Sequence, residues 1–437
     1  MTDTSAKPAP VAANGYVLPR TAPPIAVSGL ILSMALIAVG GGLIFAYIPI
    51  RLGSLGFSPS SAGWILTSMA AGGFVGCLGT GPMVKRVGHA RAYMTLAAIL
   101  ILSHLTLALT VDPMLWMGAR AGYGLAATGL FIISQSWLND ACPNEWRGRV
   151  MAIFYMAYVL CIGLGGFLIT FVDIESGVAP QLAIFFVTLA ILPVGLTNLK
   201  APLPPEYVTV SFRGVWRISP VGLAGLLAVG GLSMLVQGFA PIYANAIGYS
   251  KDEIGLMLFL MQFGMIAVQM PLGALSDRMD RRKVLIMACV LVLIFAGITS
   301  QVGGEIGLWV MIALFGVWAG ATETIYAVAN AHANDRAEPQ YYVALSMTML
   351  FAWSLSGFVL PGAASFLTDI YGAKAFMYVA MVIALVYGLF VAYRMTRREG
   401  VPVEAQEAYE PRAAQAAYAP ELYAPVTEED IDQEVPR

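Results

Sequence analysis

The carboxyl group of Glu323 lies deep within one of the long apolar stretches of this sequence, residues 307–331. At helical spacing it shares a face with a small, polar set of residues: Gly316, Ala319, Tyr326 and Asn330. We expect this face to line a cavity. Burial disfavours the charged form of a carboxyl group and brings its protonation within reach of physiological pH. Glu323 is therefore a candidate for proton coupling or cation binding, and the alternative is a structural glutamate that is hydrogen-bonded between two helices.

A second charged group, Arg120, lies within the apolar stretch 114–137, about two helical turns from its start. A charge inside a membrane helix costs ~2.5–3.5 kcal/mol on insertion scales. Arg120 should therefore face an aqueous or paired interior, as the charge partner of Glu323 or as an anchor for an anion. The alternative is a side chain that extends to the nearby membrane surface.

The elements that must position these groups are membrane-spanning helices. Only 11% of the 437 residues are charged, 58% are hydrophobic, and the mean hydropathy is +0.75. A soluble domain carries about 25% charged residues, and a helix needs roughly 20 apolar residues to cross a bilayer. Twelve such stretches are predicted, near 26–50, 62–84, 92–110, 114–137, 150–172, 181–199, 220–245, 253–275, 284–302, 307–331, 342–366 and 373–394.

The distribution of positive charge predicts the orientation of these spans. With the amino terminus in the cytoplasm, the tails and even-numbered loops hold 20 of the 24 Lys and Arg residues. The opposite side keeps Arg51, Lys251 and Lys374, and Arg120 lies within a span. We therefore expect a multi-pass membrane protein with both termini in the cytoplasm.

The two halves of the chain repeat one another. A shift of 192 residues places 49–86 on 241–278 with ten identities, where chance gives roughly three. The matches include loop residues such as Gly56/Gly248 and Ser58/Ser250. With six spans in each half, the repeats are parallel and related by an axis along the membrane normal.

These observations predict an all-α membrane protein with twelve transmembrane helices in two pseudo-symmetric six-helix bundles. Residues 26–199 form the first bundle, 200–219 a cytoplasmic linker, and 220–394 the second bundle. Residues 1–25 form a cytoplasmic amino-terminal tail. Residues 395–437 are expected to be a disordered acidic cytoplasmic tail, because a segment of this composition cannot bury enough apolar surface to fold.

The loop after the eighth span combines a glycine, an acid four residues later and a basic cluster, Gly273-Ala-Leu-Ser-Asp277-Arg278-Met-Asp280-Arg281-Arg282. It resembles the signature loop of the major facilitator superfamily. The first-half copy keeps Gly81, Arg86 and Gly88 but has Lys85 where that pattern expects aspartate. Physically, Asp277 among arginines could act as a cytoplasmic latch that holds the halves together in one conformation, and the alternative is solvated positive-inside charge. The candidate gate residues are Gly81, Arg86, Gly88, Gly273, Asp277, Arg278, Arg281 and Arg282.

The resemblance extends over about residues 25–394. Arg120, followed by Gly124, resembles the fourth-span arginine of that superfamily. Its first, fourth, seventh and tenth spans line the central path, which implies Gln135, Gln237, Tyr326 and Asn330 as further site residues; the alternative for each is an interhelical hydrogen bond. Gln135-Ser-Trp137-Leu-Asn139 resembles the YcaD-like bacterial group. This likeness implies a location in a bacterial inner (plasma) membrane, but it implies no substrate.

The sequence favours a secondary active transporter that moves a small solute by alternating access, coupled to protons through Glu323. A uniporter of the same fold and a membrane sensor or adaptor that signals through the acidic tail are the alternatives. No Walker loop, zinc-ligand spacing or nucleophile elbow is present, so neither a cofactor nor an enzymatic activity is expected. The expected partners are an unidentified small-molecule substrate, protons and the lipid bilayer, with no nucleic acid, and the chain is expected to be monomeric.

Overall fold

A computed structural model of the chain describes residues 24–142, 144–196, 210–303, 305–338, 341–403 and 406. Its first half contains α1 (Pro24–Ser54), α2 (Pro59–Val87), α3 (His89–Leu109), α4 (Pro113–Ala141), α5 (Asn144–Leu168), the 3₁₀ turn η1 (Ile169–Phe171) and α6 (Val178–Gly195). A short helix, α7 (Phe212–Ile218), precedes the second half. That half contains α8 (Pro220–Ala246), α9 (Lys251–Ser276), α10 (Arg281–Gln301), α11 (Leu308–Asn334), α12 (Tyr342–Tyr371) and α13 (Ala375–Met395).

Each predicted span coincides with one long helix. In the described part of the chain, 11 helices are long and apolar enough to cross a membrane. The twelfth, α4, occupies the predicted place but is more polar, because it carries Arg120, Gln135 and Asn139. These three side chains are buried by neighbouring helices, so α4 need not present them to lipid. The fifth span ends earlier as an α-helix than predicted, and η1 completes it.

The starts of these helices follow local capping chemistry. The side chain of Asp112 accepts hydrogen bonds from the backbone N–H groups of Met114 and Leu115, and Pro113 occupies the first helical position of α4. Ser250 and Glu253 form a reciprocal capping box at the start of α9. The caps satisfy backbone donors at these helix ends. Because the cap at Asp112 fixes where α4 begins, it also fixes the distance of Arg120 from that end of the helix.

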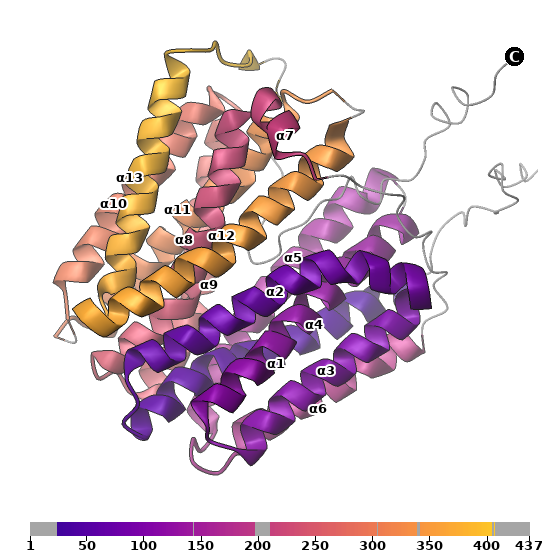
Figure 1. Cartoon of the computed structure of the whole chain (residues 1–437), viewed down its shortest axis with the longest axis vertical. Helices are drawn as coiled ribbons and strands as arrows, with labels where there is room; N and C mark the ends of the chain where they lie inside the picture. The colour runs from indigo at the N-terminus through magenta and orange to yellow at the C-terminus, as the bar shows by residue number, and fades with distance from the viewer. Residues whose placement is uncertain are drawn as a thin grey trace, which may run out of the picture.

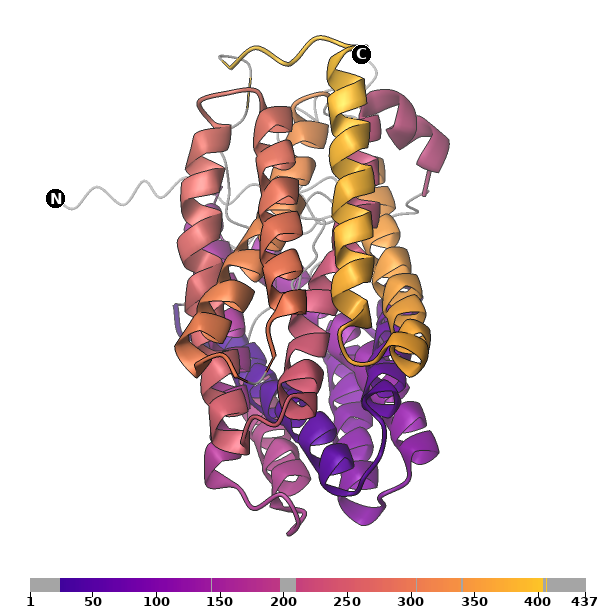
Figure 2. The ribbon, with the colours of Figure 1, turned by 90° about the vertical axis from the view of Figure 1, so that its left-hand side faces the viewer.

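The helices form two bundles with the same internal packing, visible in Figures 1 and 2 as an indigo-to-purple half and a pink-to-yellow half. In the first half, α1 packs on α5 and α6, α2 on α4, and α3 on α4 and α6. In the second half, α8 packs on α12 and α13, α9 on α11, and α10 on α11 and α13. The pairs correspond one to one, which confirms the predicted pseudo-symmetric architecture. Between the halves, α2 packs on α12 and α5 on α9.

The repeated glycines hold equivalent helix crossings. A Cβ atom added to Gly72 in α2 would lie 1.8 Å from the carbonyl oxygen of Ala121 in α4. Its repeat partner Gly264 in α9 also lies close against Gly316 in α11, where an added Cβ would be 2.8 Å from the Cα atom. The backbones touch at both crossings, which is why small residues recur there.

Several sequence predictions lie outside the described residues. The amino-terminal tail up to residue 23, the linker segment 197–209 and most of the acidic tail beyond residue 403 belong to this group. The described end of the linker forms α7, and residues 396–403 continue from α13.

Candidate functional site

A cavity of about 160 Å³ lies between the two halves. Helices α1, α2, α4 and α5 supply one wall, and α8, α9 and α12 supply the other. Its described lining is aromatic, aliphatic and glycine-rich, and none of these lining side chains carries a charge. Concave, mostly apolar sites with a few polar groups are typical of small-molecule binding.

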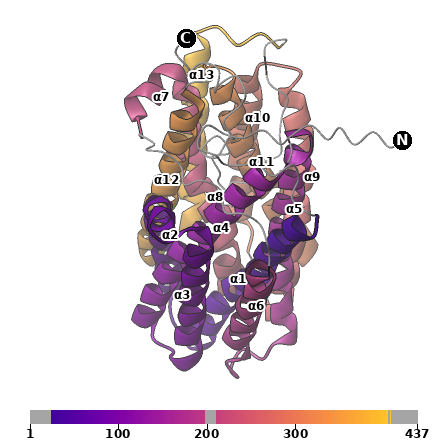
Figure 3. The ribbon, with the colours of Figure 1, turned by 90° about the vertical axis from the view of Figure 1, so that its right-hand side faces the viewer.

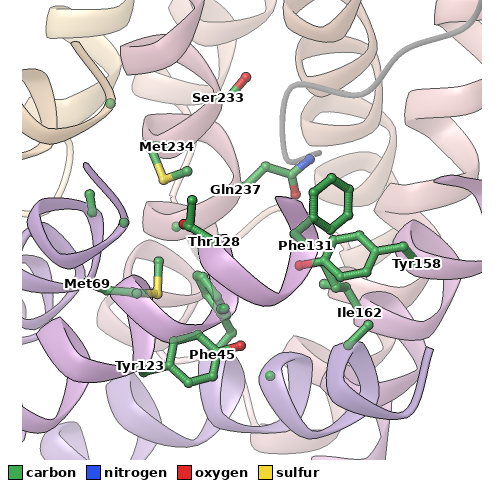
Figure 4. A pocket seen from close by; sticks show the side chains of 18 of the residues that line it. Phe45, Met69, Tyr123, Thr128, Phe131, Tyr158, Ile162, Ser233, Met234 and Gln237 are labelled. Carbon is green, nitrogen blue, oxygen red and sulfur yellow. The ribbon is translucent and has the colours of Figure 1, made fainter. Parts of the chain in front are cut away.

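The two walls differ in their polar groups (Figure 4). On the first-half side, Phe131 packs edge to face against Tyr158 with ring centroids 4.9 Å apart. Across the cavity, Gln237 of α8 accepts a hydrogen bond of 3.4 Å from Nε2 of Gln262 in α9. The aromatic rings can therefore pack against the apolar part of a bound solute, and the amide and hydroxyl groups can form hydrogen bonds with its polar part.

Glu323 lies one layer behind this lining. Its residue is fully buried in α11, and Ser233 of α8, which lines the cavity, donates a hydrogen bond of 3.1 Å to its Oε1 atom. Nε2 of Gln269 in α9 lies 3.5 Å from the backbone carbonyl oxygen of the same residue. Glu323 is therefore contacted from two neighbouring helices, by Gln269 at its backbone and by Ser233 at its carboxyl group. The Ser233 hydroxyl group links this carboxyl group to the cavity.

Arg120 lies beneath the opposite wall and is 2% exposed. Its guanidinium carbon is 4.0 Å from the ring centroid of Tyr123 and 5.4 Å from that of Phe45, and Nη2 contacts the sulfur of Met69 at 2.8 Å. All three partners line the cavity. Arg120 has no carboxylate partner in the described part of the chain, and its Nη1 atom has no hydrogen-bond partner there. The structure thus does not bring Arg120 and Glu323 together.

The remaining site candidates fall into two groups. Gln237 lines the cavity, as described above. Gln135 is buried inside the first bundle, where it donates to the hydroxyl group of Tyr155 at 2.6 Å. Tyr326 and Asn330 are buried in α11, where Asn330 donates to the backbone carbonyl of Tyr326 at 2.9 Å. These three lie among the packed helices, outside the described lining.

Hydrogen bonds join the halves at one end of the helices. Nδ2 of Asn245 donates to the carbonyl oxygen of Pro49 at 3.2 Å, and Nζ of Lys251 donates to that of Val172 at 2.9 Å. The hydroxyl groups of Thr67 and Ser365 are 3.3 Å apart. These contacts lie near the loops with few positive charges.

The opposite, basic end of α2 is less enclosed. An added Cβ at Gly79 or Gly81 would meet no atom within 4 Å, in contrast to the tight crossing at Gly72. Arg86 is exposed there, and Gly88 turns the chain into α3 with a φ of +80°. The glycine of the first signature loop therefore makes no close helix contact in this conformation.

The second signature loop is held within its own half. Arg281, 1% exposed, binds Asp335 at the end of α11 through two hydrogen bonds of 2.6 and 3.3 Å. Asp277 lies 3.7 Å from Arg281 and is 37% exposed. Asp280, the counterpart of Gly88, caps α10 and pairs with Arg282 at 2.6 Å. Gly273 is buried in α9, and Arg278 is exposed.

Burial by itself would raise the pKa of Asp280, but its hydrogen bonds with the side chain and backbone of Arg282 and the nearby positive charge outweigh burial. They hold the pKa of this carboxyl group below its ordinary value. Asp280 therefore stays ionised and ties the loop to the start of α10.

The aromatic and methionine lining was not singled out from the sequence, although Tyr158, Gln262 and Trp353 are polar residues within predicted spans. Apolar residues at helical spacing are compatible with packing, lipid contact or a cavity wall, so their types do not separate these roles. Ser233 carries a weak signal, as a small polar residue near Gly230-Gly231 in an apolar span.

The sequence of this chain is similar to those of known membrane transporters. The sequence model described as Major Facilitator Superfamily matches residues 30–218 and 221–425. A protein of Escherichia fergusonii, named uncharacterized MFS-type transporter YcaD, is 25% identical over 379 residues, covering 86% of this chain and 96% of its own length. The Escherichia coli protein of that name is 25% identical over 369 residues, covering 83% and 93%.

Two solved structures share the fold. A mutant of the nucleoside transporter NupG superposes with a TM-score of 0.65 at 12% identity, covering 85% of this chain and 99% of its own. The human organic anion transporter MFSD10 (TETRAN) superposes with a TM-score of 0.60 at 16% identity, covering 84% and 100%. At these identities the likeness concerns the arrangement of helices.

Proposed function

The chain belongs to the Major Facilitator Superfamily, and from this premise we propose that it is a secondary active transporter that moves a small solute by alternating access and is coupled to protons. The observation that carries the proposal is the central cavity, which both halves line and behind which one carboxyl group is buried. Binding sites at the interface of two repeats, opened to either side by rocking of the bundles, are typical of such transporters.

The contacts between the halves support a conformation open toward the basic side. The hydrogen bonds of Asn245 and Lys251 close the end with few positive charges, whereas the glycines at the basic end of α2 are unpacked. With the basic loops in the cytoplasm, this is the inward-facing state. Solute exchange with the cytoplasm, followed by closure of the basic ends, completes half of the transport cycle.

The position of Glu323 supports proton coupling. The hydroxyl oxygen of Ser233 can accept a hydrogen bond from a water molecule in the cavity while its O–H group donates to the carboxyl group, so the hydroxyl group connects the two. Burial makes a carboxyl group costly to ionise, and its protonation state can bias which conformation is preferred. We assign Glu323 the role of coupling group.

Arg120 supports a different step. It packs against Phe45, Met69 and Tyr123, so a solute that moves these lining side chains also changes the surroundings of the guanidinium group. We assign it the role of a positioning residue for the cavity wall. A direct ion pair with Glu323 is not part of this assignment, because Arg120 has no carboxylate partner among the described residues.

The test begins with a thermal-shift screen of the purified chain against a metabolite library, since a ligand of the folded state raises its stability. A solute found in this way is then offered to proteoliposomes with an imposed pH gradient. We expect accumulation that follows the gradient and collapses with a protonophore. The Glu323→Gln variant should exchange the solute but no longer concentrate it.

Two outcomes contradict the proposal. Concentrative, gradient-driven transport by Glu323→Gln would remove the coupling role from this residue. Flux that ignores pH in the unsubstituted protein would identify a uniporter. The Ser356→Ala variant serves as the control, because Ser356 is buried in the same half but donates to the carbonyl oxygen of Trp353 in its own helix.

A further inference from the structure

The basic end of the second half contains a compact group of arginines outside the transport cavity. Arg282, Arg336, Arg394 and Arg398 converge with His332 around a small cavity, which we call the arginine pocket. Its volume is about 10 Å³, room for about one water-sized group such as a single oxygen atom. Arg282 lies at the start of α10 and Arg394 at the end of α13, whereas Arg336 and Arg398 lie in the segments that follow α11 and α13.

Positive charge exceeds negative charge in this pocket. Arg282 pairs with Asp280, but Arg336, Arg394 and Arg398 have no carboxylate partner among the described residues. Arg336 donates to the backbone carbonyl of Glu399 at 2.8 Å, and Arg398 to that of Ile218 at 3.2 Å. Neutral carbonyl groups hold these guanidinium groups in place without neutralising them.

The pKa of the Arg336 guanidinium group reflects the repulsion between these positive charges. Burial lowers its pKa below the ordinary value, and the positive charges of Arg398 and Arg282 lower it further, against a smaller opposing effect of Asp280 and Asp335. Its Nε atom is buried and has no hydrogen-bond partner within the described chain. An anion in the pocket would relieve the repulsion and satisfy this donor.

The backbone adds to the positive potential. Pro220 and Val221, the first residues of the 27-residue helix α8, also line the pocket. The amino end of a helix carries partial positive charge and favours anions. The pocket therefore combines a fork-shaped set of guanidinium donors with a helix start, an arrangement suited to the oxygens of a phosphate group.

The surroundings of the pocket mark a membrane surface. Helix α7 lies beside α13 at this end of the bundle (Figures 2 and 3). Trp216 of α7 packs on Phe390 of α13, with ring centroids 5.8 Å apart, and is 46% exposed. Tyr393, one turn further along α13, is 52% exposed. Exposed aromatic residues of this kind gather at the level of lipid headgroups.

From this juxtaposition we propose that the arginine pocket binds the phosphate of an anionic phospholipid in the leaflet that meets the basic loops. The headgroup phosphate would contact Arg336, Arg394 and Arg398, and the acyl chains would lie along α13 near Trp216 and Tyr393. Basic pockets between transmembrane helices are known to take such headgroups. The site is separate from the transport cavity and independent of the proposed function.

The test uses the full chain, purified in detergent, with thermal unfolding and native mass spectrometry as readouts. Dioleoylphosphatidylglycerol should raise the melting temperature and remain bound, whereas dioleoylphosphatidylcholine at the same mole fraction should do neither. The Arg394→Gln variant should bind phosphatidylglycerol about fivefold more weakly, since one arginine at a membrane surface is worth about 1 kcal/mol. The side chain of Arg394 makes no hydrogen bond or ion pair in the described chain, so its replacement should not disturb folding.

Arg213→Gln is the matched control, because it removes the same charge from exposed α7 but does not line the pocket. Equal losses in Arg394→Gln and Arg213→Gln would overturn the proposal and indicate general surface attraction. Full stabilisation by millimolar inorganic phosphate would assign the pocket to a free anion and overturn the lipid. A variant in which Glu428, Glu429, Asp430 and Asp432 are replaced by their amides tests the acidic tail as the occupant. Stabilisation by phosphatidylglycerol that appears only in this variant would assign the pocket to the tail and overturn the lipid proposal.

Discussion

Ser233 and Glu323 lie on different helices, α8 and α11, and are joined by a hydrogen bond of 3.1 Å from the serine hydroxyl group to Oε1. Only the serine belongs to the described cavity lining. The pair therefore connects the cavity to a carboxyl group that is otherwise enclosed by protein.

Replacing Ser233 by alanine should slow proton-coupled transport without unfolding the protein. The change removes one hydrogen bond, worth about 1 kcal/mol, and the hydroxyl group that joins the cavity to Glu323. We expect a reduction of about tenfold in gradient-driven uptake in proteoliposomes, with a nearly unchanged melting temperature. Ser233→Thr, which restores a hydroxyl group, should recover part of the rate. Normal uptake by Ser233→Ala would show that protons reach Glu323 by another path.

Replacing Arg120 by lysine should destabilise the first bundle although the charge is kept. A lysine lacks the planar guanidinium group that faces the rings of Tyr123 and Phe45. The lost cation–π contacts are worth about 0.5–2 kcal/mol, so the melting temperature should fall by a few degrees. The same substitution at exposed Arg213 should leave it unchanged. If Arg120→Lys melts with the unsubstituted protein, the ring contacts contribute nothing to stability.

The two carboxyl groups that face Arg281 should differ in their importance for folding. Asp335→Asn leaves the buried guanidinium of Arg281 without its two-hydrogen-bond partner, and breaking a buried pair costs about 3–5 kcal/mol. Asp277 is 3.7 Å away and partly exposed, where pairs contribute about 0–1 kcal/mol. Thermal unfolding should therefore show a large loss for Asp335→Asn and a small one for Asp277→Asn.

A transport assay separates stability from gating in the same two variants. If Asp277 acts as a latch in the state with closed basic ends, Asp277→Asn should fold normally and still alter the transport rate. A normal rate in this variant would leave the acid of the signature loop with a topological role alone.

The architecture was predictable because lipid imposes strong constraints on sequence. Spanning helices must be long and apolar, basic residues gather on one side, and the repeat includes loop positions such as Gly56 and Gly248. Both of these glycines have positive φ, 78° and 91°, so the same turn geometry explains the repeated residue type. The early end of α5 was missed because the residues of η1 are as apolar as a helix.

The candidate site was less predictable. The stripe of Gly316, Ala319, Tyr326 and Asn330 was expected to line a cavity, but it packs inside the second bundle, where Gly316 touches Gly264. Small residues on a helix face serve close helix packing as readily as a cavity. Gln237 lines the cavity, whereas Glu323 lies behind Ser233, which does. This difference depends on how α8 and α11 are rotated about their axes, which hydropathy does not determine.

Lowering the pH should reduce the stability that Asp280 contributes at the start of α10. The pKa of Asp280 is lower in the folded chain than in the unfolded chain, so the unfolded state binds more protons at low pH. The stability from Asp280 is then fully present above its unfolded pKa, about 3.9, and is lost as the pH falls through the lower folded value. Asp280→Asn should melt earlier than the unsubstituted protein at pH 7, and this difference should vanish at acid pH. In an Arg282→Gln background the effect of Asp280→Asn should shrink, and its persistence would remove the ion pair as the cause.

Alanine substitutions along α2 should separate helix packing from gating. Gly72→Ala places a methyl group 1.8 Å from the backbone oxygen of Ala121, so α2 and α4 must move apart. Overpacking of this kind costs about 1–3 kcal/mol or more, and we expect poor expression or a melting temperature lower by several degrees. Gly79→Ala meets open space and gains helix propensity of about 0.5–1 kcal/mol, so it should melt at the same temperature or higher.

The transport rate of the Gly79 variant then tests the conformational assignment. If the basic end of α2 packs against other helices only when that side closes, Gly79→Ala should be stable and yet slow in turnover, because its methyl group opposes closure. A bulkier Gly79→Leu should slow turnover further while the protein still folds. It should also increase the labelling of a cysteine introduced at Thr128 in the cavity lining by a thiol-reactive reagent added from the basic side. Full activity in both variants would show that this face of α2 stays open throughout the cycle.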